Sequence, residues 1–197
     1  AVQGSREALQ PARELLDRAA DLIYRELRFP NVDLPLLDPE DPGFLIVRAR
    51  GGAYKERIRH VDRLSVATGI MGAAVGERRT QLVADVAADP RYVVPPSGLA
   101  VRAELAVPIL LGEQVLGVLN VEGPEPFDED DATTLETIAG FLAVAIRNAE
   151  LTRRAQELDA EITAAQRILL SHRAAEQQRT RVLIAERIDA MERQGSE

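Results

Sequence analysis

The sequence predicts an α+β domain followed by one long C-terminal helix. Two hairpins, over residues 32–50 and 104–121, lie between segments whose apolar residues recur at helical spacing. From residue 128 to residue 194 the chain contains one glycine, Gly140, and no proline. Strands grouped in hairpins, with helices grouped at the two ends, are typical of the α+β class.

The N-terminal segment predicts a helix over residues 6–28, because its apolar residues recur at three- and four-residue intervals and Pro30 follows. The first hairpin comes next, with strands at 32–37 and 44–50 joined by residues typical of turns. Pro35 cannot donate a hydrogen bond to a neighbouring strand, so we expect a bulge or a break there.

Short elements are expected between the two hairpins. A loop or short helix leads from Gly51 to His60, and brief strands are expected at 63–67 and 80–83. The small residues of 69–76 predict a short helix packed closely on the sheet. Prolines and glycine over residues 85–98 predict a loop.

The second hairpin has the clearest local signal. Gly112 occupies the first position of a two-residue turn, which suits a type II′ turn between strands 104–111 and 114–121. Both faces of these strands are largely apolar, as Leu105 and Ala106 illustrate. We therefore expect central strands that are covered on both sides.

The last helix is predicted to begin after Asp128, a favourable N-cap residue followed by three further acidic residues. Its apolar residues alternate at three- and four-residue intervals, first from residue 135 to 149 and again from 151 to 169. That spacing indicates a coiled coil or a helix bundle. The residues predicted for a dimerising and signalling helix are Leu135, Ile138, Leu142, Leu151, Leu158, Ile162 and Leu169.

Composition excludes several classes of function. The 32 acidic residues outnumber the 24 basic ones and give a net charge of -8, which argues against nucleic-acid binding. The chain has no cysteine, and therefore no disulfide, thiolate metal site or cysteine nucleophile. No apolar run approaches the length of a membrane span, and no leader sequence opens the chain. We expect a cytoplasmic protein without a membrane segment.

Four segments in order resemble the GAF family of small-molecule sensory domains. The first is the hairpin turn Leu37-Asp38-Pro39-Glu40, and the second joins Gly69-Ile70-Met71-Gly72 to the run from Asp85 to Tyr92. The third runs from Arg102 to Ile109 and continues with Gly117-Val118-Leu119-Asn120-Val121. The fourth runs from Pro126 to Asp131 and into the helix that contains Ala139 to Ala149.

The resemblance implies a GAF-like (PAS/profilin-like) antiparallel sheet of about six strands. Helices from both termini would pack on one face, and shorter helices and loops on the other would cover a ligand pocket. It also implies a homodimer through the terminal helices, as in bacterial sensor kinases and other two-component systems. The predicted domains are an N-terminal helix over residues 1–30, a GAF domain over 31–150 and a helical coiled-coil extension over 151–197.

The resemblance also bears on cofactors, whose identity stays unknown. Family members that bind cyclic nucleotides carry an Asn-Lys…Phe…Asp-Glu signature, and Val121 and Ala132 replace two of its residues here. Covalent bilin attachment and reduction of free methionine sulfoxide both use cysteine in this family, so both are excluded. Haem binding is disfavoured, because His60 does not stand at a matching motif position, and the residues after His172 do not match those of a kinase phosphoacceptor histidine.

The function expected from the resemblance is that of a sensory module, with no catalytic residue, no metal site and no enzymatic activity. A ligand-free dimerisation and signal-transfer module is the alternative, and a pocket filled by Met71 and Tyr92 would favour it. Asp85, Asp89 and Arg91 either form a polar pocket wall or a capped turn with an internal ion pair. The predicted ligand-binding residues are Tyr54, Ile70, Met71, Asp85, Arg91, Tyr92, Arg102 and Glu104.

Overall fold

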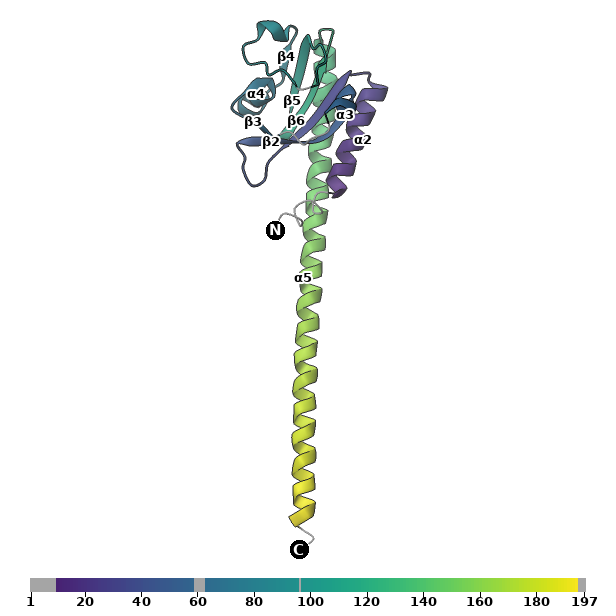
Figure 1. The fold of residues 1–197 in the computed structure, drawn as a ribbon, viewed down its shortest axis with the longest axis vertical. Helices are drawn as coiled ribbons and strands as arrows, with labels where there is room; N and C mark the ends of the chain where they lie inside the picture. Colours follow the sequence, from purple (N-terminus) through teal and green to yellow (C-terminus); the bar gives the residue numbers. More distant parts are fainter. Residues whose placement is uncertain (1–9, 59–62, 96, 195–197) are drawn as a thin grey trace. The chain divides into compact units, whose positions relative to one another are not determined.

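A computed structural model describes residues 10–58, 63–95 and 97–194 of the chain (Figure 1). The chain divides into two compact units, Ala1–Glu150 and Leu151–Glu197. The first unit contains the sheet and the second is helical. Residues 6–9 of the predicted N-terminal helix, and His60, lie outside the described residues.

The first unit is built on one sheet of six strands, in which every neighbouring pair is antiparallel. The strands are β1 (Asn31–Leu37), β2 (Phe44–Gly52), β3 (Arg63–Ser65), β4 (Gln81–Val83), β5 (Ala103–Leu111) and β6 (Gln114–Gly123). Their order across the sheet is β3-β2-β1-β6-β5-β4. The predicted α+β class with a six-stranded antiparallel sheet is therefore confirmed.

Local sequence chemistry explains both hairpins. The pairing of β1 with β2 shifts register between Leu34 and Pro35, so the predicted bulge is confirmed. Gly112 has a φ of 59° between β5 and β6, whereas Glu113 is not among the described residues with positive φ. Positive φ at the first turn residue alone is the type II′ pattern, as predicted.

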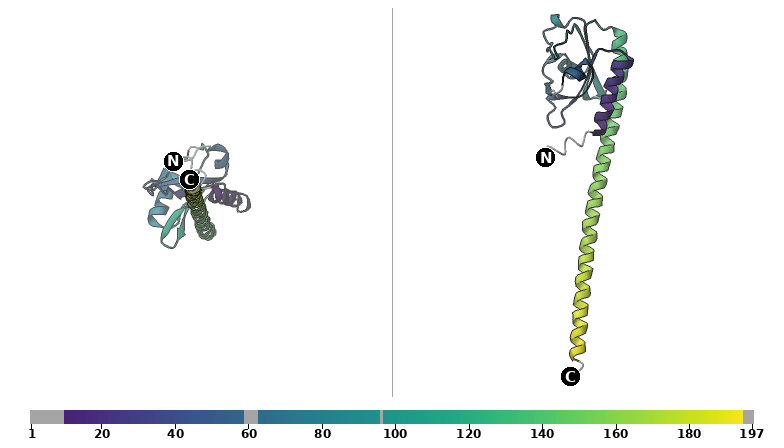
Figure 2. Two further views of the ribbon diagram at one scale, coloured as in Figure 1. Left: turned by 90° about the horizontal axis from the view of Figure 1, so that it is seen from below. Right: turned by 45° about the vertical axis from the view of Figure 1, so that its right-hand side comes forward.

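Helices and one 3-10 turn surround the sheet. They are α2 (Gln10–Glu26), α3 (Ala53–Arg57), α4 (Gly69–Glu77), η1 (Val86–Ala88) and α5 (Glu129–Gln194). Figures 1 and 2 show α2 and the first turns of α5 side by side on one face of the sheet. The expected strand at 63–67 is shorter than predicted, because the chain turns after Ser65 toward α4.

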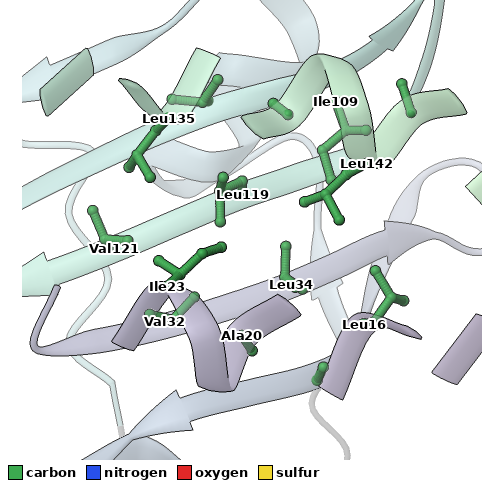
Figure 3. Close-up of a cluster of buried hydrophobic side chains, with 14 of the residues drawn as sticks. Leu16, Ala20, Ile23, Val32, Leu34, Ile109, Leu119, Val121, Leu135 and Leu142 are labelled. Atoms are coloured by element: carbon green, nitrogen blue, oxygen red, sulfur yellow. The ribbon is translucent and has the colours of Figure 1, made fainter. Parts of the chain in front are cut away.

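The main apolar core lies between the sheet and these two helices (Figure 3). Leu16 and Ile23 of α2 and Leu135 of α5 are buried against strand residues such as Val32 and Leu119. Alternate residues of β1 and β5 point to this face, whereas in β6 a register shift opposite Ile109 and Leu110 places Leu116 and Leu119 on it three positions apart. The strand residues of this core are Val32, Leu34, Leu36, Ala49, Leu105, Val107, Ile109, Leu116, Leu119 and Val121.

Helix α5 begins with a reciprocal cap. The Asp131 N–H donates to Asp128 Oδ1 over 2.9 Å, and the Asp128 N–H donates to Asp131 Oδ2 over 3.0 Å. The predicted N-cap is therefore confirmed. Leu135 and Leu142 are buried in the core and Ile138 is half-buried against it. These three residues, predicted to form a dimer interface, pack instead against the core of their own chain, because the sheet covers their side of the helix.

The second unit consists of the remainder of α5, from Leu151 to Gln194. Leu151, Leu158, Ile162 and Leu169 are exposed in this unit. No helix within the described ranges combines the length and the apolar character required to cross a membrane.

The contact between α2 and β2 depends on the absence of a side chain at Gly51. A Cβ atom there would collide with the backbone carbonyl of Ala20 in α2. We expect Gly51→Ala to lower the free energy of unfolding by about 1–3 kcal/mol, measured by urea denaturation with circular dichroism. Gly76→Ala in α4 is the control, because nothing lies within 4 Å of its added Cβ. Equal stability of the two variants would contradict this packing.

Candidate functional site

The register of β1, β6 and β5 gathers polar residues on the face opposite α2 and α5. Asp33 lies opposite Asn120, and Asn31 lies opposite Glu122. Glu122 also lies opposite Glu104 on its other side. These residues alternate with the core residues of the same strands, so they share the second face. We call Asn31, Asp33, Glu104, Asn120 and Glu122 the polar cluster; each is at most 7% exposed.

Hydrogen bonds converge on Glu122. The Tyr54 hydroxyl donates a short hydrogen bond to its carboxylate, and Asn120 Nδ2 donates to its Oε1 over 3.4 Å. Asn31 Nδ2 donates to the backbone carbonyl of Glu122 over 3.2 Å. The side-chain oxygens of Asn31 and Asn120 accept no hydrogen bond within the described part of the chain. Two buried acceptors therefore remain available beside the glutamates.

Basic groups neutralise only part of this charge. Arg50 in β2 lies opposite Asp33 in β1, and its Nε is 3.1 Å from Asp33 Oδ1. The two side chains are about nine-tenths buried. Glu104 and Glu122 have no such basic partner among the contacts of the described residues. Like charges directly opposite one another in a strand pair are destabilising.

Burial and neighbouring negative charges raise the pKa of both glutamates. Burial is the largest cause for Glu104, followed by the charges of Glu122 and Asp33. Burial also raises the pKa of Glu122, to about 7, and the charge of Asp33 adds to it, whereas hydrogen bonds from Tyr54 and Asn120 oppose the rise. Near neutral pH the facing pair of carboxyls therefore retains a proton, because ionising both carboxyls is unfavourable.

Two tyrosines lie on the same side of the sheet as the polar cluster. Tyr54 belongs to α3, which directly follows β2, and it is fully buried and bonded to Glu122. Tyr92 lies in the loop after η1, is half-buried and packs against the apolar residues of this sheet face. Burial raises the pKa of Tyr92, and the charges of Glu122 and Glu104 raise it further. Of the predicted ligand-binding residues, the structure thus brings Tyr54 and Glu104 together at Glu122.

The rest of this sheet face is apolar. Ile70 of α4 is buried against Ala106 and Val118, and Met71 packs against the same group. Ile70 and Met71, predicted to bind ligand, therefore belong to an apolar region beside the polar cluster. This packing confirms the short helix of small residues that the sequence predicts over 69–76, because Gly72 brings α4 close to the backbone carbonyl of Val66.

Three other predicted residues are exposed and do not belong to the polar cluster. Asp85 is exposed and accepts a hydrogen bond from the Ala87 N–H over 3.1 Å, which caps η1. Arg91 is exposed, with its Nη2 2.7 Å from Asp89 Oδ2. This is the capped turn with an internal ion pair, one of the two arrangements expected. Arg102 is exposed, and its backbone bonds to Val86 and Gly123.

A depression of about 500 Å³ lies over β4 and η1. It is open to solvent, and both of its carboxylates already have partners, since Asp85 caps η1 and Asp89 pairs with Arg91. The polar cluster is the stronger candidate site, because its charges are buried and incompletely compensated. No group of three or more residues suited to hold a metal ion occurs among the described residues.

Asn31, Asp33, Glu122 and Arg50 were not predicted from the sequence as site residues, and Asn120 was named only within the motifs of the family resemblance. One signal was present in the chain. Single charged or amide residues interrupt otherwise apolar strands, as Asp33 does between Val32 and Leu34. A buried strand retains such a residue when its side chain has a specific partner or ligand.

The facing glutamates make stability depend on pH. Both carboxyls have a higher pKa in the folded chain than in the unfolded chain, so their stabilising contribution is lost as the pH rises through the folded pKa values, of which that of Glu122 is about 7. We expect Glu104→Gln to raise the free energy of unfolding at about pH 8 by roughly 1–3 kcal/mol and to flatten its decrease between about pH 5 and 8. Chemical denaturation over this pH range measures both effects.

Glu113→Gln is the matched control for this substitution, because Glu113 is exposed in the turn between β5 and β6. Its effect should stay within about 0.5 kcal/mol at every pH. If Glu104→Gln behaved like this control, the two carboxyls would not be coupled as described.

Solved structures with the same fold include both GAF domains and reductases. The GAF domain of a phosphoenolpyruvate-protein phosphotransferase (ptsP) from Coxiella burnetii is 22% identical, with a TM-score of 0.64 over 75% of this chain and 92% of that one. The type II free methionine-R-sulfoxide reductase from Thermoplasma acidophilum is 20% identical, with a TM-score of 0.62 over 72% of this chain and 96% of that one. A Staphylococcus aureus fRMsr in complex with its substrate is 25% identical, with a TM-score of 0.56 over 72% and 94%.

These neighbours correct one expectation. The prediction that the chain has no enzymatic activity is wrong as an inference from the family resemblance, because free methionine-R-sulfoxide reductases are enzymes built on this fold. At 20–25% identity, these likenesses bear on the fold of this chain and leave its own reaction unassigned.

A family model described as GAF domain matches residues 10–147, which include all six strands and both core helices. The matched segment extends from the start of α2 to the part of α5 that packs on the sheet. The chain therefore belongs to the GAF domain family.

Proposed function

We propose that this chain is a sensory GAF domain of a bacterial signal-transduction protein, which binds a small cation in the polar cluster and relays its state through a dimeric C-terminal helix. Residues 31–150 are the sensing domain and residues 151–197 the signalling extension of this proposal. The observation that carries it is the pair of buried glutamates, Glu104 and Glu122, which face each other and form no ion pair with any residue that the structure describes.

The cluster suits a ligand with a protonated amine. Such a group provides a positive charge for Glu104 and Glu122 and N–H donors for the unoccupied side-chain oxygens of Asn31 and Asn120. Asp33 already has Arg50 as its partner, so the uncompensated charge is that of the glutamate pair. The surrounding burial strengthens the attraction between these groups and a cation.

Binding of such a ligand competes with protons. A cation favours the ionised glutamates, whereas the free site retains proton near neutral pH because its pKa values are raised. Binding is therefore accompanied by proton release, and affinity increases with pH until the amine itself loses its proton. The polar cluster is buried in this structure, so entry of a ligand requires displacement of side chains that bury it.

The relay uses the two faces of the same strands. Asn120 and Glu122 belong to the polar cluster on one face of β6, while Leu119 and Val121 on its other face pack in the core with α2 and α5. A change in β6 on ligand binding would therefore alter the packing of α5 directly. A ligand shifts the helix arrangement only by the difference in its affinity for the two arrangements.

A ligand-free signal-transfer module is the second candidate. It is favoured by the complete burial of the cluster and by the packing of Ile70 and Ala74 of α4 on the same sheet face. The two functions differ in one observable. Native mass spectrometry of protein purified without denaturation would show a retained small molecule only for the sensory function.

Isothermal titration calorimetry with L-amino acids and with the corresponding decarboxylated amines tests the sensory function. We expect a bound amine whose affinity rises about tenfold or more between about pH 6 and 8, with proton release detected by varying the buffer. Glu122→Gln should lower the affinity at least about tenfold, because it removes one of the two carboxylates.

Glu113→Gln should bind the same amine with unchanged affinity, since Glu113 lies at the exposed tip of the β5–β6 hairpin. Absence of binding by every amine, together with no mass retained in native spectra, would leave the ligand-free module as the better account.

A further inference from the structure

Two buried amide oxygens in the polar cluster have no hydrogen-bond partner. Asn31 and Asn120 are 6% and 1% exposed, and both donate from their side-chain nitrogens to Glu122. Their side-chain oxygens accept no hydrogen bond from any residue that the structure describes. Because a buried oxygen without a donor is unfavourable, these two atoms indicate a ligand that donates hydrogen bonds.

The charges on this face of the sheet favour a ligand with a net positive charge. Of the three buried carboxyls, one is paired with Arg50, whereas Glu104 and Glu122 form no ion pair within the described ranges. Arg91 attracts Glu104 and Asp89 repels it, and these two residues pair with each other. A free amino acid would bring a further carboxylate to the buried glutamates, whereas an amine without a carboxylate supplies only the missing positive charge.

The paired strands β5 and β6 change from polar to apolar along this face. Glu104 lies opposite Glu122, and the next pair on the same face joins Ala106 to Asn120. The third pair, which contains Val118, is apolar on both strands. Successive pairs on one face are about 7 Å apart, because each residue advances an antiparallel strand by about 3.4 Å. A tail of a few carbons therefore reaches from the two carboxyls to the apolar end of the face.

The apolar end of this face has a covering that can rearrange. Ala106 and Val118 are fully buried in an apolar cluster with Ile70 of α4. Met71 and Tyr92 pack against that cluster and are only half-buried. A methionine side chain is unbranched and adapts to the shape around it, so Met71 can move to admit a ligand tail. A second ammonium group placed here would be buried without a partner.

We propose that the ligand of the polar cluster is an apolar primary amine without a carboxylate. Its ammonium group binds between Glu104 and Glu122, and its N–H donors satisfy the unpartnered amide oxygens. Its tail lies over Ala106 and Val118. The inference rests on the sensory function proposed above and specifies the class of its ligand.

Isothermal titration calorimetry of the full chain with a matched set of compounds tests the ligand class. Isoamylamine is the expected ligand, at about pH 8, where a primary amine is still protonated. L-leucine adds a carboxylate to it, putrescine replaces the apolar tail with a second ammonium, trimethylated isoamylamine lacks N–H donors, and isoamyl alcohol lacks the charge. We expect isoamylamine to bind at least about tenfold more tightly than each of the other four.

The position of the tail is tested by Ala106→Val, which adds two methyl groups where the tail is expected. This substitution should lower the affinity for isoamylamine at least about tenfold and leave the affinity for ethylamine, whose tail is shorter, within about twofold. Retained binding of ethylamine also shows that the variant is folded. Ala100→Val is the matched control, because Ala100 is exposed and the same change should leave both affinities unaltered.

The outcomes separate this inference from the proposed function. Binding of L-leucine or putrescine as tight as that of isoamylamine would overturn the ligand class and leave a sensory domain for another cation. An Ala106→Val variant that binds isoamylamine normally, or that loses both amines equally, would overturn the position of the tail. Absence of binding by every compound with a primary amine would count against the proposed sensory function itself.

Discussion

The antiparallel register of β1, β6 and β5 is the constraint on which the whole domain depends. Because side chains alternate along a strand, this register sends Val32, Leu119 and Leu105 to one face and Asp33, Asn120 and Glu104 to the other. A slip of one residue would exchange the faces and bury charge beneath α2 and α5. The core and the polar cluster are thus two consequences of one pairing pattern.

The core also explains how the polar cluster is retained. Facing glutamates are unfavourable in a strand pair, yet the apolar packing on the opposite face holds β5 and β6 in this register. Their repulsion is relieved by a bound proton in the free chain and, in our proposal, by a cationic ligand. A site of this kind couples occupancy to the packing of α5, because the same strands support both.

The features that depend on a few neighbouring residues were predicted from the sequence. The bulge at Pro35, the turn at Gly112 and the cap at Asp128 each follow from the chemistry of a few neighbouring residues. The site was only half predicted, because Glu122 meets Asn31 and Tyr54 through strand pairing between distant parts of the chain.

The buried and the exposed apolar faces of α5 show a second reason why the sequence alone was not sufficient. Both have the three- and four-residue spacing of a helix face, so periodicity alone did not show which one the sheet covers. Burial in the folded chain separates them, with Leu135 covered and Phe141 exposed. The family resemblance likewise predicted the fold correctly, whereas the expectation of no enzymatic activity drawn from it was wrong, because one fold supports many functions, including those of enzymes.

Titration of the side-chain carboxyl groups by carbon-13 NMR tests the central claim most directly, with Glu104→Gln and Glu122→Gln used to assign the signals. The account predicts that at least one of these two carboxyls ionises near neutral pH and that removal of either lowers the pKa of the other. Two carboxyls that ionise independently below about pH 5 would contradict it.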